Sequence, residues 1–268
     1  DGRREFAASE SAYVLAAQHE PMPTLSTFQQ LGFSLITQGK FEAADSVVDA
    51  YEKAGGVAPA AMEFVRAVGL YDRGRVDSSH AMLLKLDTAS DPATRSTVVA
   101  SIGMMDESKG RLGSALTYML KANAIDRARG ALAPVGADSL QKAFFDAWFR
   151  DRGPQAVRTL DAALAAQPLR TFPANQSPYA QVATVYAIAG RPDRARAVLA
   201  EMDAAYAHNP GLRESMRPLQ QRALGYVALA ENHPTQALQY FRASDSLSDG
   251  PADDCAACTA FVLGLAPL

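Results

Sequence analysis

Residues 179–199 read YAQVATVYAIAGRPDRARAVL, and they show most clearly the pattern from which the fold of the chain can be inferred. Its first part carries apolar residues at spacings of three and one, which places them on one stripe of a helix: Tyr179, Val182, Ala183 and Tyr186. Gly190 then ends that helix, because glycine adopts the left-handed backbone of a tight turn without steric cost. Ala195 and Leu199 form the inward stripe of a second helix. The stretch therefore predicts two helices packed together across a short turn.

The same pattern occurs six times along the 268 residues. A small residue marks the centre of the second helix in each copy: Ala44, Ser79, Ala115, Ala156, Ala195 and Ala237. These positions lie 35, 36, 41, 39 and 42 residues apart. A repeat of this length with two helices is typical of a helical solenoid, in which each unit completes its core only by stacking on its neighbours.

The first copy suggests why small residues recur. Gly32 and Ala44 lie where we expect the two helices of one pair to cross, and a large side chain would push their axes apart. The pairs are expected to turn at five residues: Gly39, Gly74, Gly110, Gly190 and Asn232. Asn232 stands in for glycine because its short polar side chain tolerates the left-handed backbone.

The fourth copy departs from the pattern. Phe144 occupies a position where a small residue is expected, and the turn over residues 151–154 places its glycine differently. We therefore expect irregular helix packing in this copy. Pro, Gly and Asn residues also predict three longer loops, at residues 131–138, 167–178 and 208–217. Three prolines fit the first turns of second helices: Pro154, Pro192 and Pro234.

The chain resembles the tetratricopeptide repeat family. That signature places an aromatic residue, a Leu-Gly pair and a second aromatic on the first helix, then Ala and Phe on the second. Two segments carry the likeness best: Phe28-x-x-Leu31-Gly32 with Ala44-x-x-x-Val48, and Tyr179-x-x-Val182-Ala183-x-x-Tyr186 with Ala195-x-x-x-Leu199. The copies are longer than the usual ~34 residues of the family. Arg66 and Asp106 occupy positions that are apolar in the family.

The resemblance implies an all-α fold, a right-handed superhelical solenoid of about six helix-turn-helix repeats. We expect one domain over residues 1–268, with a leading helix in 1–24, six repeats in 25–249 and a half repeat or capping helix in 250–268. The segment Cys255–Ala266 is almost wholly apolar, which predicts self-association through the terminal helices. The chain begins with Asp1 instead of Met, so we expect a processed protein or a piece of a longer one.

The bulk composition and the motifs argue against several functions. A net charge of −3 does not resemble the basic surface of a nucleic-acid-binding protein, and no apolar run reaches the ~18 residues that a membrane helix needs. Residues 32–40 begin and end like a phosphate-binding loop, but six residues separate Gly32 from Gly39 and Phe41 follows Lys40. The four histidines are scattered, and neither a nucleophile elbow nor a metal-ligand pair is present. We expect no enzymatic activity and no cofactor.

Cys255-Ala-Ala-Cys258 is the one motif that resembles a cofactor site. A zinc site would need two more ligands, and haem attachment would need a histidine where Thr259 stands. Two interpretations stay open, namely small apolar residues packing on the sixth repeat and a disulfide.

In tetratricopeptide arrays, the first helices line the concave face. The resemblance places nine residues of this chain there: Phe33, Ile36, Val68, Tyr71, Met104, Phe145, Trp148, Thr184 and Tyr226. This surface is apolar and aromatic in its middle, which suits an amphipathic helix or an apolar peptide. Gln29 and Arg222 are isolated, so a clamp for a peptide's terminal carboxylate is not expected. The opposite interpretation, in which a tight superhelix or the loops bury these aromatics, stays open.

The sequence therefore favours a non-enzymatic scaffold that binds peptide or helical segments of a partner protein on an apolar concave groove. Two alternatives remain. One is a regulatory repeat segment of a larger bacterial signalling enzyme, such as a Ser/Thr kinase or a cyclase. The other is a structural protein that assembles with copies of itself, because the ends of solenoids expose apolar surface. The compartment and the partner's identity do not follow from the sequence.

Overall fold

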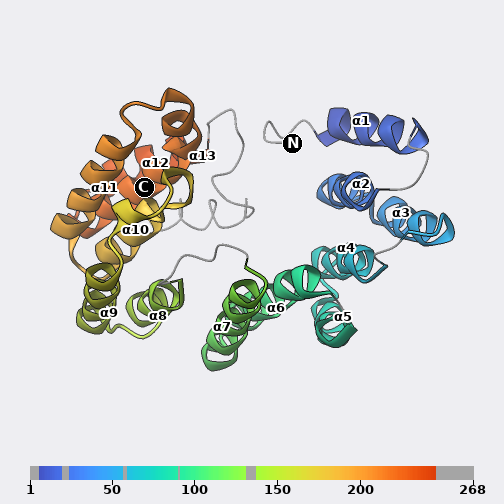
Figure 1. The fold of residues 1–268 in the computed structure, drawn as a ribbon, viewed down its shortest axis with the longest axis horizontal. Coiled ribbons are helices and arrows are strands. Elements are labelled where there is room, and N and C mark those ends of the chain that lie inside the picture. Colours follow the sequence, from blue (N-terminus) through green and yellow to red (C-terminus); the bar gives the residue numbers. More distant parts are fainter. Residues whose placement is uncertain (1–5, 20–23, 57–58, 90, 131–136, 246–268) are drawn as a thin grey trace. The chain divides into compact units, whose positions relative to one another are not determined.

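The computed structural model describes residues 6–19, 24–56, 59–89, 91–130 and 137–245. All regular structure in these residues is helical (Figure 1). The helices are α1 (Phe6–His19), α2 (Leu25–Thr37), α3 (Phe41–Lys53), α4 (Pro59–Asp72), α5 (Val76–Ala89), α6 (Pro92–Ser108), α7 (Leu112–Ala128), α8 (Ala137–Trp148), α9 (Gly153–Ala166), α10 (Tyr179–Ile188), α11 (Pro192–Tyr206), α12 (Pro210–Ala230) and α13 (Pro234–Asp245). Two short 3₁₀ helices precede α10: η1 (Leu169–Thr171) and η2 (Ala174–Gln176).

Contacts divide the chain into two compact units, one within residues 3–132 and the other from residue 133 onward. The first unit contains α1 and the pairs α2–α3, α4–α5 and α6–α7, and the second contains the pairs α8–α9, α10–α11 and α12–α13. The all-α helical repeat predicted from the sequence is confirmed. The division into a leading helix in 1–24 and six repeats in 25–249 stays a prediction, and α1 lies within the first of these ranges. That residues 1–268 form one domain stays a prediction, and residues 250–268, with Cys255 and Cys258, lie outside the described residues.

Five of the six pairs turn in the same way. The predicted turn residues have positive φ values between 62° and 77°: Gly39, Gly74, Gly110, Gly190 and Asn232. In the first turn, the amide of Gly39 donates to Ile36 O at 2.8 Å and the amide of Lys40 donates to Leu35 O at 2.9 Å. These two bonds satisfy carbonyls that the end of α2 leaves without helical partners.

The fourth turn is irregular, as predicted. Asp151, with φ of 52°, takes the left-handed position there, and the amide of Arg152 donates to Asp146 O at 2.8 Å. Gly153 has a different role from the other turn glycines. A Cβ atom on it would lie 2.8 Å from the carbonyl oxygen of Ala189, so this glycine permits a close backbone approach between α9 and the end of α10.

The small residues at the centres of the second helices lie in the cores of the units. All six of these side chains are no more than 3% exposed: Ala44, Ser79, Ala115, Ala156, Ala195 and Ala237. The explanation for Gly32 was wrong, however. A Cβ atom there would lie 2.6 Å from Cγ1 of Val65, so the nearest neighbour of Gly32 is on α4 of the next pair and not on α3. Gly32 therefore sets the distance between successive pairs.

One loop prediction was also wrong. Residues 208–217 were expected to form a loop, but α12 begins at Pro210 and runs to Ala230. Asn209 caps this helix, because its side chain accepts a hydrogen bond of 3.0 Å from the amide of Leu212. Pro210 occupies the first turn, where the missing N–H costs nothing, and the buried Pro218 is accommodated within the helix. The predicted loop over residues 167–178 contains η1 and η2.

Ion pairs connect the second helix of one pair to the next pair. Arg66, which replaces an apolar residue of the repeat signature, lies 2.6 Å from Asp49 on α3. Asp87 on α5 is buried, and it accepts hydrogen bonds from Arg95 on α6, at 2.9 Å, and from Lys121 on α7. Burial by itself would raise the pKa of Asp87, but the bonds from Lys121 and Arg95 outweigh it and hold the pKa below its usual value.

We expect Asp87→Asn to destabilise the protein by about 1 kcal/mol at neutral pH, because it removes two charge-assisted hydrogen bonds whose basic partners are partly exposed. A lowered pKa means that this stability is present above the unfolded-state value and is lost as the pH falls through the folded-state value. The difference between the variant and the parent should therefore disappear in acid. Urea unfolding followed by circular dichroism at neutral and acid pH measures it. Asp77→Asn, which alters a fully exposed carboxylate, is the matched control.

Candidate functional site

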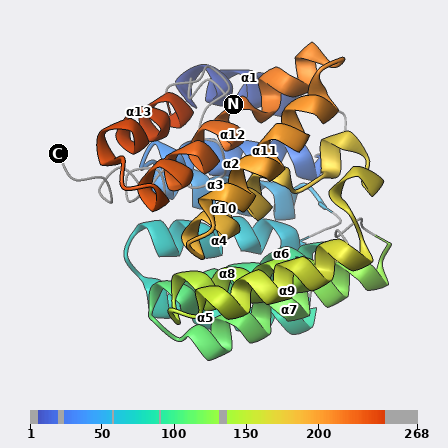
Figure 2. The same ribbon diagram turned by 90° about the vertical axis from the view of Figure 1, so that its left-hand side faces the viewer.

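The first helices of successive pairs lie side by side within each unit. In the first unit α2 contacts α4, and α4 contacts α6; in the second, α10 contacts both α8 and α12. Figure 1 shows α2 and α4 on one side of the first unit and α3 and α5 on the other. Figure 2 shows the second unit from another direction, with α12 alongside its partner α13. Each unit thus presents one surface made of first helices, on which the predicted partner-binding residues were placed.

In the first unit, most of the predicted residues reach the surface. Met104 on α6 is 57% exposed and Tyr71 on α4 is 38% exposed, so both large apolar side chains reach solvent. Phe33 and Val68 are half-buried, and the ring of Phe33 meets Phe64 edge to face, with 6.2 Å between the centroids. Ile36 differs, because it is 5% exposed and belongs to the core around α2, α3 and α4. The Ile36 side chain therefore has too little exposed area to contact a partner.

In the second unit, the predicted aromatics pack on one another. Trp148 on α8 lies edge to face with Tyr226 on α12, with 5.9 Å between the centroids, and Tyr226 lies 5.3 Å from Phe241. Trp148 also stacks on Phe144, the large residue that breaks the repeat pattern. Phe145 is 0% exposed. The structure therefore leaves Trp148 and Tyr226 half-buried at the surface of first helices and removes Phe145 from it.

Two polar residues on the first helices, Gln29 and Arg222, are not arranged as a clamp for a peptide's terminal carboxylate. The side-chain amide of Gln29 donates to Ala61 O at 2.8 Å, which ties α2 to α4. Arg222 lies one helical turn before Tyr226, and burial lowers the pKa of its guanidinium while it raises the pKa of the Tyr226 phenol. Both side chains are half-buried, and their partial burial is the main cause of both shifts.

Serine, histidine and aspartate come together at one place in the first unit. Ser114 on α7 donates a hydrogen bond to Asp106 on α6, and His80 Nε2 lies 3.5 Å from Asp106 Oδ1. In a catalytic triad the histidine accepts the proton of the serine, whereas here the serine bonds to the carboxylate. Asp106 is 2% exposed, so the hydrogen bond from Ser114 supplies a partner that this buried carboxyl group needs. This arrangement explains how an aspartate replaces an apolar residue of the repeat signature.

The described residues hold no group of three or more histidine, cysteine or acidic side chains placed to bind a metal ion. Within the same residues, no helix has both the length and the apolar character needed to span a bilayer.

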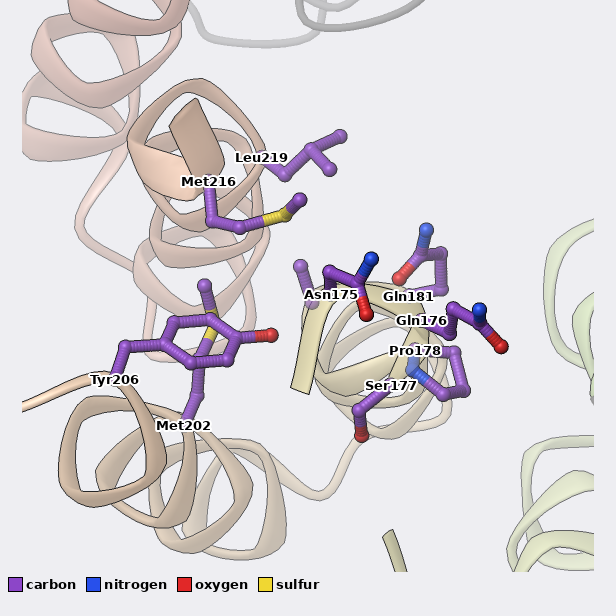
Figure 3. Close-up of a pocket in the computed structure, with 10 residues that line it drawn as sticks. Asn175, Gln176, Ser177, Pro178, Gln181, Met202, Tyr206, Met216 and Leu219 are labelled. Carbon is purple, nitrogen blue, oxygen red and sulfur yellow. The ribbon is translucent and has the colours of Figure 1, made fainter. Parts of the chain in front are cut away.

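A pocket that sequence reasoning missed lies in the second unit, where η2 and α10 face α11 and α12 (Figure 3). Its volume is about 180 Å³. Tyr206 from α11 and Met216 from α12 lie on one side, and Asn175 and Gln181 lie on the other. A sequence signal was available, because the loop over residues 167–178 lengthens this copy, but the signal does not say that the loop lines a pocket.

Comparison with known proteins supports the fold. No family model matches the chain, and no curated protein matches it. Among solved structures, the chain is similar to a tetratricopeptide repeat protein from Parabacteroides merdae ATCC 43184, with a TM-score of 0.56 and 16% sequence identity. The match covers 98% of this chain and 92% of the other. At this identity the likeness concerns the fold, which is that of a tetratricopeptide-like helical repeat.

Proposed function

We propose that the chain is a non-enzymatic scaffold that binds a peptide or helical segment of another protein on its first helices. Tetratricopeptide-like folds are typically protein-interaction modules, which supports the general class. The observation that carries the proposal is the exposure of Tyr71 and Met104. Both occupy positions predicted to face a partner, and both present large apolar side chains to water on neighbouring first helices.

The proposal takes six of the predicted positions, each unit being considered by itself: Phe33, Val68, Tyr71 and Met104 in the first unit, and Trp148 and Tyr226 in the second. Half-buried aromatic residues suit this role, because they supply contact area at little cost in side-chain entropy. An apolar stripe of this kind fits the apolar face of an amphipathic helix, or alternate side chains of an extended peptide. Ile36 and Phe145 are left out because they lie in the cores of the units.

The double variant Tyr71→Ser, Met104→Ser is expected to lose the partner while it keeps the fold. Both side chains are exposed, so their removal should change the free energy of unfolding by less than about 1 kcal/mol. Affinity capture with immobilised parent and variant, followed by mass spectrometry, compares the proteins that each retains. A specific partner should be retained by the parent and depleted at least about tenfold with the variant, since interface anchors contribute over 1 kcal/mol each.

Leu84→Ser provides the matched control. Leu84 is 41% exposed, which is close to the exposure of Tyr71, but it lies on α5, a second helix. A protein that adheres to any exposed apolar residue would be captured less by Leu84→Ser than by the parent, and as little as by the double variant. Equal loss with the control and the double variant would therefore refute the proposal. Circular dichroism of all three proteins establishes that each is folded.

We keep self-assembly as a second candidate. Leu15 and Val14 on α1, the first described helix, are 56% and 38% exposed. Exposed apolar residues on a helix are a recognised source of association between copies of a protein.

A further inference from the structure

We propose that the pocket between η2, α10, α11 and α12 is a binding site for one aromatic side chain of a polypeptide, with the adjoining main chain held by side-chain amides at the rim. This site is separate from the surface of first helices described above. None of its lining residues is among the six positions of that surface, and it includes residues from a loop and from a second helix. The proposal therefore extends beyond the proposed function and stands or falls by itself.

The size of the pocket decides what it can hold. Pockets for cofactors and drug-sized ligands usually measure about 300–1,000 Å³. At about 180 Å³, this pocket is smaller than that range, but it exceeds the ~150 Å³ known to accommodate benzene in an apolar protein cavity. One phenyl-sized group therefore fits, whereas a nucleotide or a whole folded segment does not.

The walls favour an aromatic group over an aliphatic one. Met202, Tyr206, Met216 and Leu219 supply the apolar side, and none of the residues lining the pocket is charged. Two thioethers on one wall are polarisable and flexible, and sulfur makes favourable contacts with aromatic rings. Tyr206 is 2% exposed and burial raises the pKa of its phenol, so it stays neutral near neutral pH. Figure 3 shows its hydroxyl directed toward the opposite wall.

The rim supplies the groups that a peptide backbone requires. Asn175, Gln176 and Gln181 lie on the side opposite Tyr206 and Met216 (Figure 3), and Asn175 and Gln181 are exposed to solvent. Each primary amide both donates and accepts hydrogen bonds, which matches the N–H and C=O groups of a main chain. With no charged residue in the lining, a phosphate, a carboxylate or a metal ion would find no counter-charge there. An uncharged segment around an aromatic residue fits all of these features.

Methionine methyl NMR tests the proposal directly. The probe is N-acetyl-phenylalaninamide, titrated into the full chain labelled at its methionine methyl groups, with N-acetyl-alaninamide as the reference compound. Met202 and Met216 line the pocket, and their resonances are assigned from Met202→Leu and Met216→Leu variants. Because an aromatic ring shifts nearby methyl resonances, we expect saturable shifts at both positions with the phenylalanine probe and much smaller shifts with the alanine compound.

Met119 is the internal control, because it is half-buried on α7, a second helix of the other unit, and belongs to neither proposed site. Equal shifts at Met119, or equal shifts with the alanine compound, would show non-specific association and overturn the proposal. So would the absence of saturable shifts at Met202 and Met216 up to the solubility of the probe. Asn175→Ala combined with Gln181→Ala should weaken binding about tenfold, because two hydrogen bonds are lost. Gln239→Ala, an exposed amide on α13, should leave binding unchanged.

The two proposals can fail independently. The Tyr71→Ser, Met104→Ser variant tests the surface of the first unit and leaves the pocket intact, whereas the NMR titration requires no natural partner. If the chain binds the phenylalanine probe and the Tyr71→Ser, Met104→Ser variant retains every partner of the parent, the pocket proposal is supported and the proposed binding surface on the first helices is refuted.

Discussion

Gly225→Ala is expected to destabilise the protein by about 1–3 kcal/mol, although it adds a single methyl group. Gly225 is buried on α12, and a Cβ atom there would overlap the ring of Phe241 on α13. The ring cannot move aside cheaply, because Phe241 is 1% exposed and is held edge to face against Tyr226. The two helices would have to separate instead.

A glycine-to-alanine substitution elsewhere in α12 should have the opposite effect on stability. Gly211 is exposed in the first turn of the helix, and a Cβ atom there meets only the side chain of Asn209 at an ordinary distance of 3.8 Å. Gly211→Ala should stabilise the protein by about 0.4–1 kcal/mol, because alanine has less conformational freedom to lose on folding. Urea unfolding followed by the fluorescence of Trp148, the only tryptophan, reports on this unit. Equal effects at the two glycines would contradict the packing described here.

Phe145→Ala is expected to cost about 3–5 kcal/mol, the largest single effect that we predict. The side chain is fully buried and lies 5.2 Å, centroid to centroid, from Phe149. Alanine would leave a cavity that two short helices, α8 and α9, cannot easily close. Trp148 fluorescence during urea unfolding again provides the measurement.

Met104→Ala provides the contrast, because Met104 was assigned to the same surface but is 57% exposed. Its removal should change stability by less than about 0.5 kcal/mol, measured by circular dichroism in the same titration. If Phe145→Ala were equally mild, Phe145 would be a surface residue after all, and the original assignment to the groove would stand.

The helices, their pairing and most of their turns were predictable, because each depends on local chemistry. Glycine at 39, 74, 110 and 190 is the residue that best tolerates a left-handed turn, and Asn232 is a recognised substitute. The small residues at the centres of the second helices follow from the close crossing of helices. These features need no knowledge of distant contacts.

The predictions from sequence were wrong where the local structure depends on a contact with a distant residue, or on a capping residue that offsets helix-breaking residues. Gly32 faces Val65, 33 positions later, and spacing within one repeat does not reveal that neighbour. Residues 208–217 contain a proline, a glycine and an asparagine, yet Asn209 and Pro210 begin a helix with them. The pocket beside η2 forms only when α10, α11 and α12 have packed together.

The candidate site was predictable in part, for a geometric reason. Successive residues on a helix point about 100° apart, so assigning a surface depends on the exact phase of each helix. In α8, Phe144 stacks on Trp148 while the next residue, Phe145, points into the core. Ile36 was lost to the core in the same way, whereas Tyr71 and Met104 proved to be exposed. An error of one residue in the helical phase therefore assigns a core residue to the surface, or a surface residue to the core.

The contact between Gly32 and Val65 bears on how far this chain can be treated as modular. Repeat proteins are often re-engineered by deleting, duplicating or exchanging whole repeats, which presumes interchangeable junctions. Here the glycine of one repeat fits a particular β-branched side chain of the next, and Asp87 joins its repeat to Arg95 and Lys121 of the following one. These two junctions are therefore individually matched. A rearranged array would require the residues of each to be transplanted together, Gly32 with Val65 and Asp87 with Arg95 and Lys121.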